Sequence, residues 1–238
     1  MLSLLPVAIL AGGLATRLGP LTERVPKSLL SVAGRPFIFH QLEMLRDQGV
    51  ERVVLCVGHL GEQIQAAVGD GATPGLTVGY SFDGDELLGT GGALKQALPL
   101  LGSEFFVLNG DSYLPCSLAA VQRAYQIAHR PALMTVLRND NRWDRSNVLF
   151  RDGALLAYDK HAPRADMRHI DFGLSVLSRS AFAQYLGARI IDLADILRDL
   201  SRSGQLAAYE VTERFYEVGS LQGLKDAEEY LSQRPGSA

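Results

Sequence analysis

Residues suited to binding phosphate cluster near the start of the chain. The segment Ala11-Gly-Gly-Leu-Ala-Thr-Arg17 follows a short apolar run. Its glycines let backbone N–H groups approach an anion without a Cβ in the way, and the planar guanidinium of Arg17 matches phosphate oxygens. An ordinary Gly-Gly turn is the alternative, because the segment is neither the GxGxxG dinucleotide fingerprint nor a Walker A loop.

A second cation follows at Lys27, ten residues after Arg17. Pro26 disfavours a helix in this linker, so we expect Lys27 on an extended strip that returns toward the glycine loop. A solvated surface lysine is the alternative interpretation. With Arg17 and Lys27 facing one loop, the segment predicts a site for a polyphosphate.

The elements that position these residues alternate between short apolar runs and amphipathic segments. We expect strands at 5–10, 52–57, 76–80, 105–108 and 132–137, and helices at 37–45, 60–68, 92–98 and 118–128. Strands that alternate with helices at this spacing are typical of a doubly wound sheet, whose ligands bind beyond the C-terminal ends of the strands. The predicted fold class is α/β, Rossmann-like and doubly wound, with a mainly parallel sheet.

The alternation breaks after residue 138. Two short runs around the turn Asp152-Gly153 predict a small β-rich insertion that carries a second substrate region. Later segments predict returning strands at 169–177 and 205–211 and helices at 191–201 and 221–232. We expect one domain of residues 1–238.

Composition excludes several classes of protein. The 238 residues are 47% hydrophobic and 21% charged, which is typical of a globular chain and not of a disordered or disulfide-stapled one. A formal charge of -3 predicts no nucleic-acid partner. No basic residue precedes the short N-terminal apolar run, and no stretch is long enough for a membrane span, so we expect a cytoplasmic protein without a membrane partner. Monomer and homodimer both stay open.

Three blocks of this chain resemble the sugar-1-phosphate nucleotidyltransferase family. They are the run from Ala11 to Pro36, Leu88-Gly-Thr-Gly-Gly-Ala93 and Leu108-Asn-Gly-Asp111, in the family's order. Members of this family join a nucleoside triphosphate to a sugar 1-phosphate and release pyrophosphate, with Mg²⁺ as cofactor. The resemblance implies a nucleotide-binding part at 1–137 and a sugar-phosphate-binding and closing part at 138–238.

The resemblance also implies roles for individual residues. Arg17, Lys27 and Asp111 are the expected catalytic residues, and Asp111 and Glu217 are the expected Mg²⁺ ligands. Glu217, in Glu-Val-Gly-Ser, stands where the family usually has the aspartate of Asp-x-Gly-Thr. The expected nucleotide-binding residues are Ala11, Gly12, Gly13, Asp83, Gly89 and Thr90. The expected sugar-phosphate-binding residues are Asn109, Lys160, Asp171 and Gly173.

Three of these interpretations have alternatives. Asp111 could instead cap the next helix, and Lys160, which lies in Asp-Lys-His and not in the family's Glu-Lys-Pro, could be a solvated lysine. The polar segment 138–147 surrounds the only tryptophan, Trp143. This tryptophan either lines the sugar pocket or plugs the core.

The implied chemistry is attack by a sugar 1-phosphate oxygen on the α-phosphorus of the triphosphate. A phosphate monoester is mostly dianionic at neutral pH, so no general base is needed and electrostatic positioning carries the rate. A non-catalytic sugar-nucleotide sensor is the hypothesis from a different class. It is disfavoured because Arg17, Lys27 and Asp111 are all present.

Fewer sequence features support a prediction of the nucleobase and the sugar. The segment Gly89–Lys95 looks closer to heptose 1-phosphate guanylyltransferases, and Asp83, Asp85 or Glu86 could accept hydrogen bonds from guanine. This favours GTP and a heptose- or mannose-type sugar 1-phosphate. We also expect the protein to have no C-terminal acetyltransferase or regulatory module. A uridylyltransferase acting on an N-acetylmuramate-type 1-phosphate and a cytidylyltransferase are the alternatives.

Overall fold

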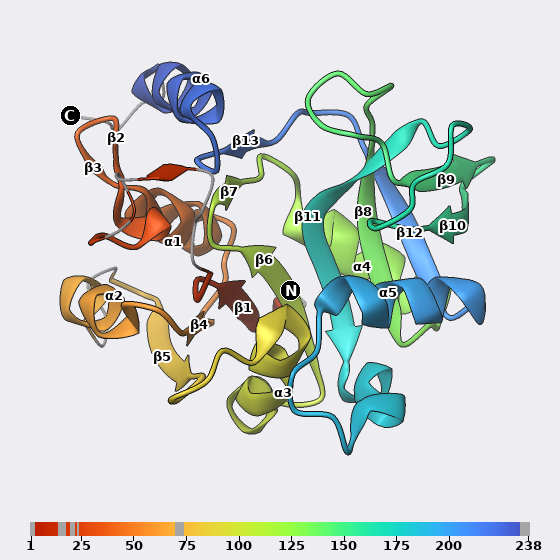
Figure 1. The fold of residues 1–238 in the computed structure, drawn as a ribbon, viewed down its shortest axis with the longest axis horizontal. Coiled ribbons are helices and arrows are strands. Elements are labelled where there is room, and N and C mark those ends of the chain that lie inside the picture. Colours follow the sequence, from red (N-terminus) through yellow and green to blue (C-terminus); the bar gives the residue numbers. More distant parts are fainter. Residues whose placement is uncertain (1–2, 14–17, 20–21, 23, 70–73, 234–238) are drawn as a thin grey trace.

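A mixed nine-stranded sheet forms the centre of the computed structural model, which describes residues 3–13, 18–19, 22, 24–69 and 74–233 (Figure 1). Its first half is parallel throughout, in the spatial order β5 (Thr77–Phe82), β4 (Arg52–Val57), β1 (Val7–Leu10) and β6 (Glu104–Asn109). The next strand, β11 (His169–Ser178), runs antiparallel to β6. The parallel half therefore directs the C-terminal ends of four strands toward one edge.

Strand β11 joins this parallel half to the later strands. It pairs antiparallel with β8 (Ala132–Arg138), which in turn pairs in parallel with β12 (Leu206–Val211). The hairpin of β9 (Val148–Arg151) and β10 (Ala154–Tyr158) attaches to β11 through Val148 and His169. The predicted β-rich insertion is therefore an extension of the main sheet.

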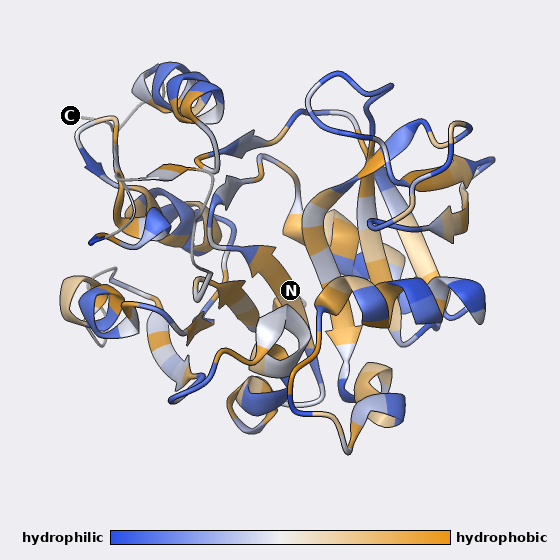
Figure 2. Cartoon of the chain, viewed as in Figure 1, coloured by the Kyte–Doolittle hydropathy of each residue, from blue (hydrophilic) through white to orange (hydrophobic). Residues whose placement is uncertain are grey.

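Helices cover both faces of the sheet and create two separate cores. Val7 and Ile9 of β1 belong to one cluster of buried side chains and Ala8 to the other, since successive residues of a strand point to opposite faces. The first cluster includes α1 (Phe37–Asp47), α2 (Gly61–Val68), α4 (Leu118–Ala128) and α6 (Leu221–Ser232). The second includes α3 (Gly89–Leu101) and α5 (Leu193–Arg202). Figure 2 shows the apolar central strands between helices that combine apolar and polar residues.

Several very short elements complete the fold. They are the two-residue strands β2 (Ser31–Val32), β3 (Arg35–Pro36), β7 (Ser112–Tyr113) and β13 (Tyr216–Glu217), with the 3₁₀ turns η2 (Lys27–Leu29) and η3 (Arg179–Tyr185). Strand β2 pairs with β3, and β7 pairs with β13. None of these was predicted. Elements of two or three residues carry no periodicity, and the seven-residue η3 is a 3₁₀ helix, which lacks the 3.6-residue period of an α-helix.

The predicted α/β, doubly wound fold class is confirmed, whereas most element bounds differ from the prediction by one to three residues and one local conformation needs correction. Helix α3 begins at Gly89 and not at residue 92, because the N–H groups of Gly91 and Gly92 donate to the Ile191 carbonyl oxygen, at 2.8 and 3.1 Å, and hold the first turn. Helix α5 begins at Leu193 and not at residue 191, since the Asp192 side chain caps it. The first strand begins at Val7, two residues later than predicted.

Lys27 does not lie on an extended strip. It begins the 3₁₀ turn η2, in which the Leu30 N–H donates to the Lys27 carbonyl oxygen at 3.1 Å. Proline restricts the residue before it more than the residue after it, so Pro26 leaves Lys27 free to enter the turn. Pro26 itself is extended, with φ -57° and ψ 144°, and immediately precedes the turn.

Both cysteines are free, and burial raises the pKa of Cys56 and of Cys116 to about 12. Thiols that resist ionisation are poor nucleophiles. Within the described ranges, no helix combines the length and apolar character needed to cross a membrane.

Candidate active site

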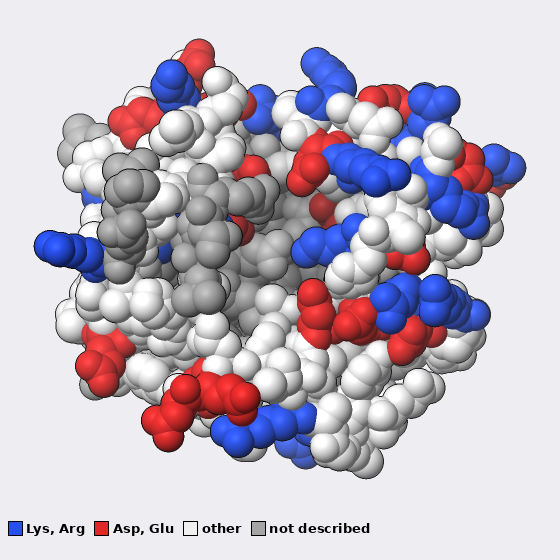
Figure 3. All heavy atoms as spheres, in the orientation of Figure 1, with Lys and Arg blue, Asp and Glu red and all other residues white. Residues whose placement is uncertain are grey.

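A cavity of about 590 Å³ lies at the C-terminal ends of β1, β4 and β6 and extends to β11. In Figure 3 the molecule is hollowed near its centre, with acidic and basic side chains along the rim toward β11 and α5. The cavity is lined by all the described residues to which the family resemblance assigned a role: Ala11, Gly12, Gly13, Lys27, Asp83, Gly89, Thr90, Asn109, Asp111, Lys160, Asp171, Gly173 and Glu217. Arg17 lies outside the described residues.

The start of the glycine loop is held against the neighbouring strand and loop. The Ala11 N–H donates to the Cys56 carbonyl oxygen at 2.8 Å, which continues the β1–β4 pairing past Leu10. A Cβ on Gly12 would lie 2.7 Å from the backbone nitrogen of Gly58. Only glycine fits this close approach, so the backbone itself forms this part of the cavity wall.

Lys27 and Asp111 form an ion pair in the lining of the cavity. The Lys27 Nζ lies 2.9 Å from Asp111 Oδ2, and the Ser112 hydroxyl donates to Asp111 Oδ1 at 3.2 Å. The two side chains are 18% and 24% exposed, so both are shielded yet accessible from the cavity. An ammonium group has three protons, so Lys27 can also donate to a phosphate oxygen.

The small β7–β13 sheet brings Glu217 to the same place. Glu217 pairs in register with Ser112, and the Val218 N–H donates to the Asp111 carbonyl oxygen at 2.9 Å. Two carboxylate residues far apart in the sequence, Asp111 and Glu217, thus reach one wall of the cavity.

The donor set fits Mg²⁺ held jointly with a ligand. The described residues contain no group of three or more His, Cys, Asp or Glu side chains that could hold a metal ion by themselves. Mg²⁺ is commonly bound through one or two carboxylates together with substrate phosphates and water. Asp111 and Glu217 supply such a pair.

A further wall of the cavity centres on an irregularity in β11. Its register against β8 shifts between Asp171 and Ser175, and Gly173 in this bulge has φ +96°. Asp171 Oδ1 accepts from the Gly173 N–H at 2.9 Å, and the Asp171 N–H donates to the Asn147 side chain at 2.9 Å. Burial raises the pKa of the Asp171 carboxyl, while the Gly173 N–H opposes that shift. Lys160, exposed just after β10, is the cation on this wall.

The Gly89–Gly92 block is bound to the start of α5. The Thr90 hydroxyl donates to Asp192 Oδ1 at 2.9 Å and accepts from the Leu193 N–H at 2.8 Å. The Gly91 and Gly92 N–H groups also donate to a protein acceptor, the Ile191 carbonyl oxygen. The block therefore lines the cavity and fastens α5 beside it.

Asp83, Asp85 and Glu86 were the acidic residues expected near the nucleobase, and of these only Asp83 is among the residues that line the cavity. It is 7% exposed, and its Oδ2 accepts from the Leu88 N–H at 3.2 Å. Burial raises the pKa of Asp83, with the Leu88 hydrogen bond opposing. Asp85 and Glu86 are exposed, and Glu86 lies 3.9 Å from Arg189.

Two arginines and two aromatic residues lie together at one part of the cavity. The sequence had indicated Arg142 and Trp143, within segment 138–147, but not Arg214 or Phe215. Trp143 lines the cavity and also packs edge-on against Phe215, with ring centroids 6.2 Å apart, at the edge of the hydrophobic core. That it lines a sugar pocket stays a prediction. The guanidinium groups of Arg142 and Arg214 lie 5.1 and 5.3 Å from the Trp143 ring centroid. Arg214 also pairs with Asp226 at 2.8 Å. The available signal for Arg214 was its place three residues before Glu217.

Comparison with known proteins gives consistent matches. The family model for nucleotidyl transferases matches residues 7–144. The chain is 32% identical over 225 residues to N-acetylmuramate alpha-1-phosphate uridylyltransferase of Neisseria meningitidis serogroup B, covering 92% of this chain and 95% of the relative. It is 27% identical over 214 residues to D-glycero-alpha-D-manno-heptose 1-phosphate guanylyltransferase of Campylobacter jejuni, covering 89% and 93%. The crystal structure of HddC from Yersinia pseudotuberculosis complexed with GMP-PN is similar with a TM-score of 0.79 and 25% identity, over 95% of this chain and 99% of that one.

Proposed function

Because this chain belongs to the nucleotidyl transferase family and is a nucleotidyltransferase, we propose that it transfers a guanylyl group from GTP to a heptose- or mannose-type sugar 1-phosphate and releases pyrophosphate. The observation that carries the proposal is the convergence of Lys27, Asp111, Glu217 and Lys160 on one cavity. In this proposal residues 1–137 bind the nucleotide, and residues 138–238 bind the sugar phosphate and close the site.

The reaction needs charge neutralisation more than proton transfer. The dianionic sugar phosphate is already a nucleophile at neutral pH, and no histidine is among the described residues that line the cavity. Lys27 and the backbone of Gly12 and Gly13 hold the triphosphate, while Lys160 draws in the sugar phosphate. Bringing two polyanions together in line is the main barrier, and fixed positive groups lower it.

Asp111 and Glu217 would hold Mg²⁺, which when bound neutralises charge on the phosphates. Lys27 keeps the Asp111 carboxylate oriented through its 2.9 Å contact. The Ser112 hydroxyl fixes the other carboxylate oxygen, Oδ1. These two contacts restrict the rotation of the Asp111 side chain.

Asp83 supports the choice of guanine. Its Oδ2 already accepts from the Leu88 N–H, whereas Oδ1 has no hydrogen bond within the described part of the chain. A carboxylate oxygen can accept from the N1–H or the 2-amino group of guanine, while uracil offers one imide donor. Similarity to HddC, whose crystal structure contains GMP-PN, supports the same base.

One comparison favours a second candidate. The relative with 32% identity is an N-acetylmuramate alpha-1-phosphate uridylyltransferase, and 95% of its length is covered. Uridylyl transfer to an N-acetylmuramate 1-phosphate is therefore the alternative that any assay must include.

A pyrophosphate-release assay of five nucleoside triphosphates against mannose, heptose, glucose and N-acetylmuramate 1-phosphates separates the two candidates. We expect the highest kcat/KM with GTP and a heptose or mannose 1-phosphate. Asp83→Asn should lower kcat/KM for GTP by about tenfold to a hundredfold, since a hydrogen bond to a charged group contributes roughly 1.5–3 kcal/mol. The exposed control Asp85→Asn should leave it unchanged. Preferred turnover of UTP with N-acetylmuramate 1-phosphate would establish the second candidate instead.

A further inference from the structure

The turn at residues 109–112, between β6 and β7, presents Asp111 to the cavity, and a side chain outside the cavity wall holds this turn. Gln41 lies on α1 and is 0% exposed. Its Nε2 donates to the Asn109 carbonyl oxygen at 2.9 Å and to the Ser112 carbonyl oxygen at 2.7 Å. One amide group therefore binds the backbone on both sides of Asp111.

The chemistry of the partners defines the orientation of this amide. Both groups that face Gln41 are carbonyl acceptors, so the NH₂ end must point toward them. The other end, Oε1, is buried without a hydrogen-bond partner among the described residues. Leaving a buried acceptor unpaired costs free energy, so its presence calls for an explanation.

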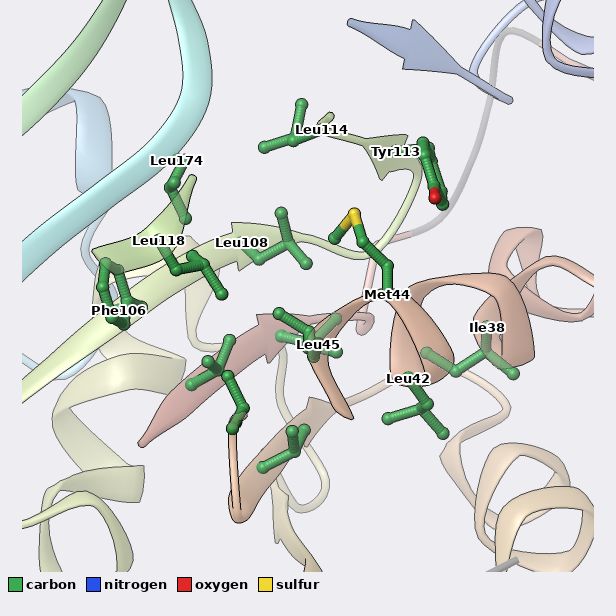
Figure 4. Packing of buried hydrophobic residues seen from close by; sticks show 14 of the residues in the cluster. Ile38, Leu42, Met44, Leu45, Phe106, Leu108, Tyr113, Leu114, Leu118 and Leu174 are labelled. Carbon is green, nitrogen blue, oxygen red and sulfur yellow. The ribbon is translucent and has the colours of Figure 1, made fainter. Parts of the chain in front are cut away.

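The surroundings of Gln41 form a rigid platform. Ile38, Leu42 and Leu45 on the same helix are fully buried. Figure 4 shows these side chains in the core that α1 shares with Phe106 and Leu108 of β6. The apolar neighbours alone do not call for an amide at position 41, so the hydrogen bonds to the Asn109 and Ser112 carbonyl groups account for Gln41 better than packing does.

We propose that Gln41 is the positioning residue for Asp111. This inference rests on the proposed function, in which Asp111 serves the reaction. By binding the carbonyl groups of Asn109 and Ser112 at once, Gln41 restricts the backbone rotations that would swing Asp111 away from Lys27 and Glu217. Displacements of about 1 Å at a reacting centre can cost about a hundredfold in rate, so this restraint matters for turnover.

Gln122 provides a matched control. It is a buried glutamine, 3% exposed, on α4. Its Nε2 donates to the Ser3 carbonyl oxygen at 3.1 Å, and its Oε1 accepts from the Leu5 N–H at 2.9 Å. It therefore makes two backbone hydrogen bonds just before the start of β1, whereas the cavity lies at the end of that strand.

The test compares Gln41→Met with Gln122→Met, because methionine approximates the shape of glutamine and removes both hydrogen bonds. We expect both variants to unfold at lower temperature. Only Gln41→Met should lower kcat at least tenfold and raise the Mg²⁺ concentration for half-maximal turnover, with KM for the sugar 1-phosphate unchanged. Only Gln41→Met should also accelerate amide hydrogen exchange in the peptide covering residues 105–114, a readout that does not depend on activity.

A second variant keeps the test decisive if Gln41→Met does not fold. Glutamate matches the shape of glutamine, and a buried carboxyl stays neutral and can donate one hydrogen bond, so Gln41→Glu should give intermediate exchange and kcat. Equal kcat, Mg²⁺ dependence and exchange in the Gln41 and Gln122 variants would overturn the inference. Wild-type protein that turns over no pair of substrates would instead contradict the proposed function, and the exchange data would still test Gln41.

Discussion

Lys27 and Asp111 are the central pair at the scale of single residues. They are 84 positions apart in the sequence and meet at 2.9 Å in the cavity. Partly exposed ion pairs contribute little to folding stability, commonly below about 1 kcal/mol. The position of this pair therefore agrees better with a role in the reaction than with a role in holding the fold.

Lys27→Ala should lower kcat by about a hundredfold or more, the scale of losing one preorganised electrostatic contact. Thermal stability should barely change. Lys225→Ala, at an exposed lysine of α6, serves as the control and should leave both quantities unchanged. Steady-state kinetics and thermal unfolding measure the two effects. A large fall in Tm for Lys27→Ala would make this lysine structural.

Asp171 couples stability to pH. Burial raises the pKa of its carboxyl in the folded state, so the charged form destabilises the fold above the unfolded-state pKa. This penalty disappears as the pH falls and both states become protonated. Asp171→Asn should therefore raise Tm at pH 7, and the gain should shrink toward pH 4. Thermal unfolding between pH 4 and 8 tests this, with Asp85→Asn as the exposed control. A Tm gain that is independent of pH would show that charge burial is not its cause.

At the scale of elements, the β7–β13 sheet decides where the two carboxylates lie. Helices α4 and α6 were predicted with their observed bounds because their apolar residues repeat with a helical period, and strand β4 because it is a short continuous apolar run. The β7–β13 sheet has two residues per strand, so no period marks it and only the family resemblance indicated that Glu217 belongs with Asp111. Its existence depends on tertiary packing between segments about a hundred residues apart.

Gly223, in the first turn of α6, tests this placement. A Cβ there would collide with the Glu217 carbonyl oxygen, so Gly223→Ala must displace either Glu217 or the helix. We expect kcat to fall at least tenfold, the Mg²⁺ requirement to rise, and stability to drop by about 1–3 kcal/mol as in other overpacked sites. Gly187→Ala is the control, since a Cβ there meets nothing within 4 Å. Similar behaviour of the two variants would mean that the Glu217 backbone position is not critical.

At the scale of the whole molecule, the parallel half and the β11 side of the sheet meet at one cavity. The glycine loop, Lys27 and Asp111 come from the first half, and Lys160 and Asp171 from the second. Residue types and spacing predicted the glycine loop and Lys27, while the roles of Asp111, Lys160 and Asp171 were predicted from the family resemblance. Gln41 could not be predicted, because a single polar residue in an amphipathic helix carries no sign that it points inward.

Lys160→Ala tests whether the two halves serve different substrates. We expect affinity for the sugar 1-phosphate to fall by about tenfold to a hundredfold, the scale of one charge-assisted contact, with affinity for the nucleoside triphosphate nearly unchanged. Calorimetric titration with each ligand separately measures both. An equal loss of affinity for both ligands would place Lys160 between them. Unchanged affinity for both would mean that Lys160 is a solvated surface lysine.

The most direct test of the central claim follows the oxygen atoms of the sugar phosphate. Purified protein is incubated with Mg²⁺, GTP and a heptose or mannose 1-phosphate labelled with ¹⁸O in its phosphate, and the products are analysed by mass spectrometry. Attack by a sugar-phosphate oxygen on the α-phosphorus predicts a GDP-sugar that carries all the label, with unlabelled pyrophosphate in equal amount. Label in the pyrophosphate, or no nucleoside diphosphate sugar from any triphosphate and sugar 1-phosphate pair, would contradict the account.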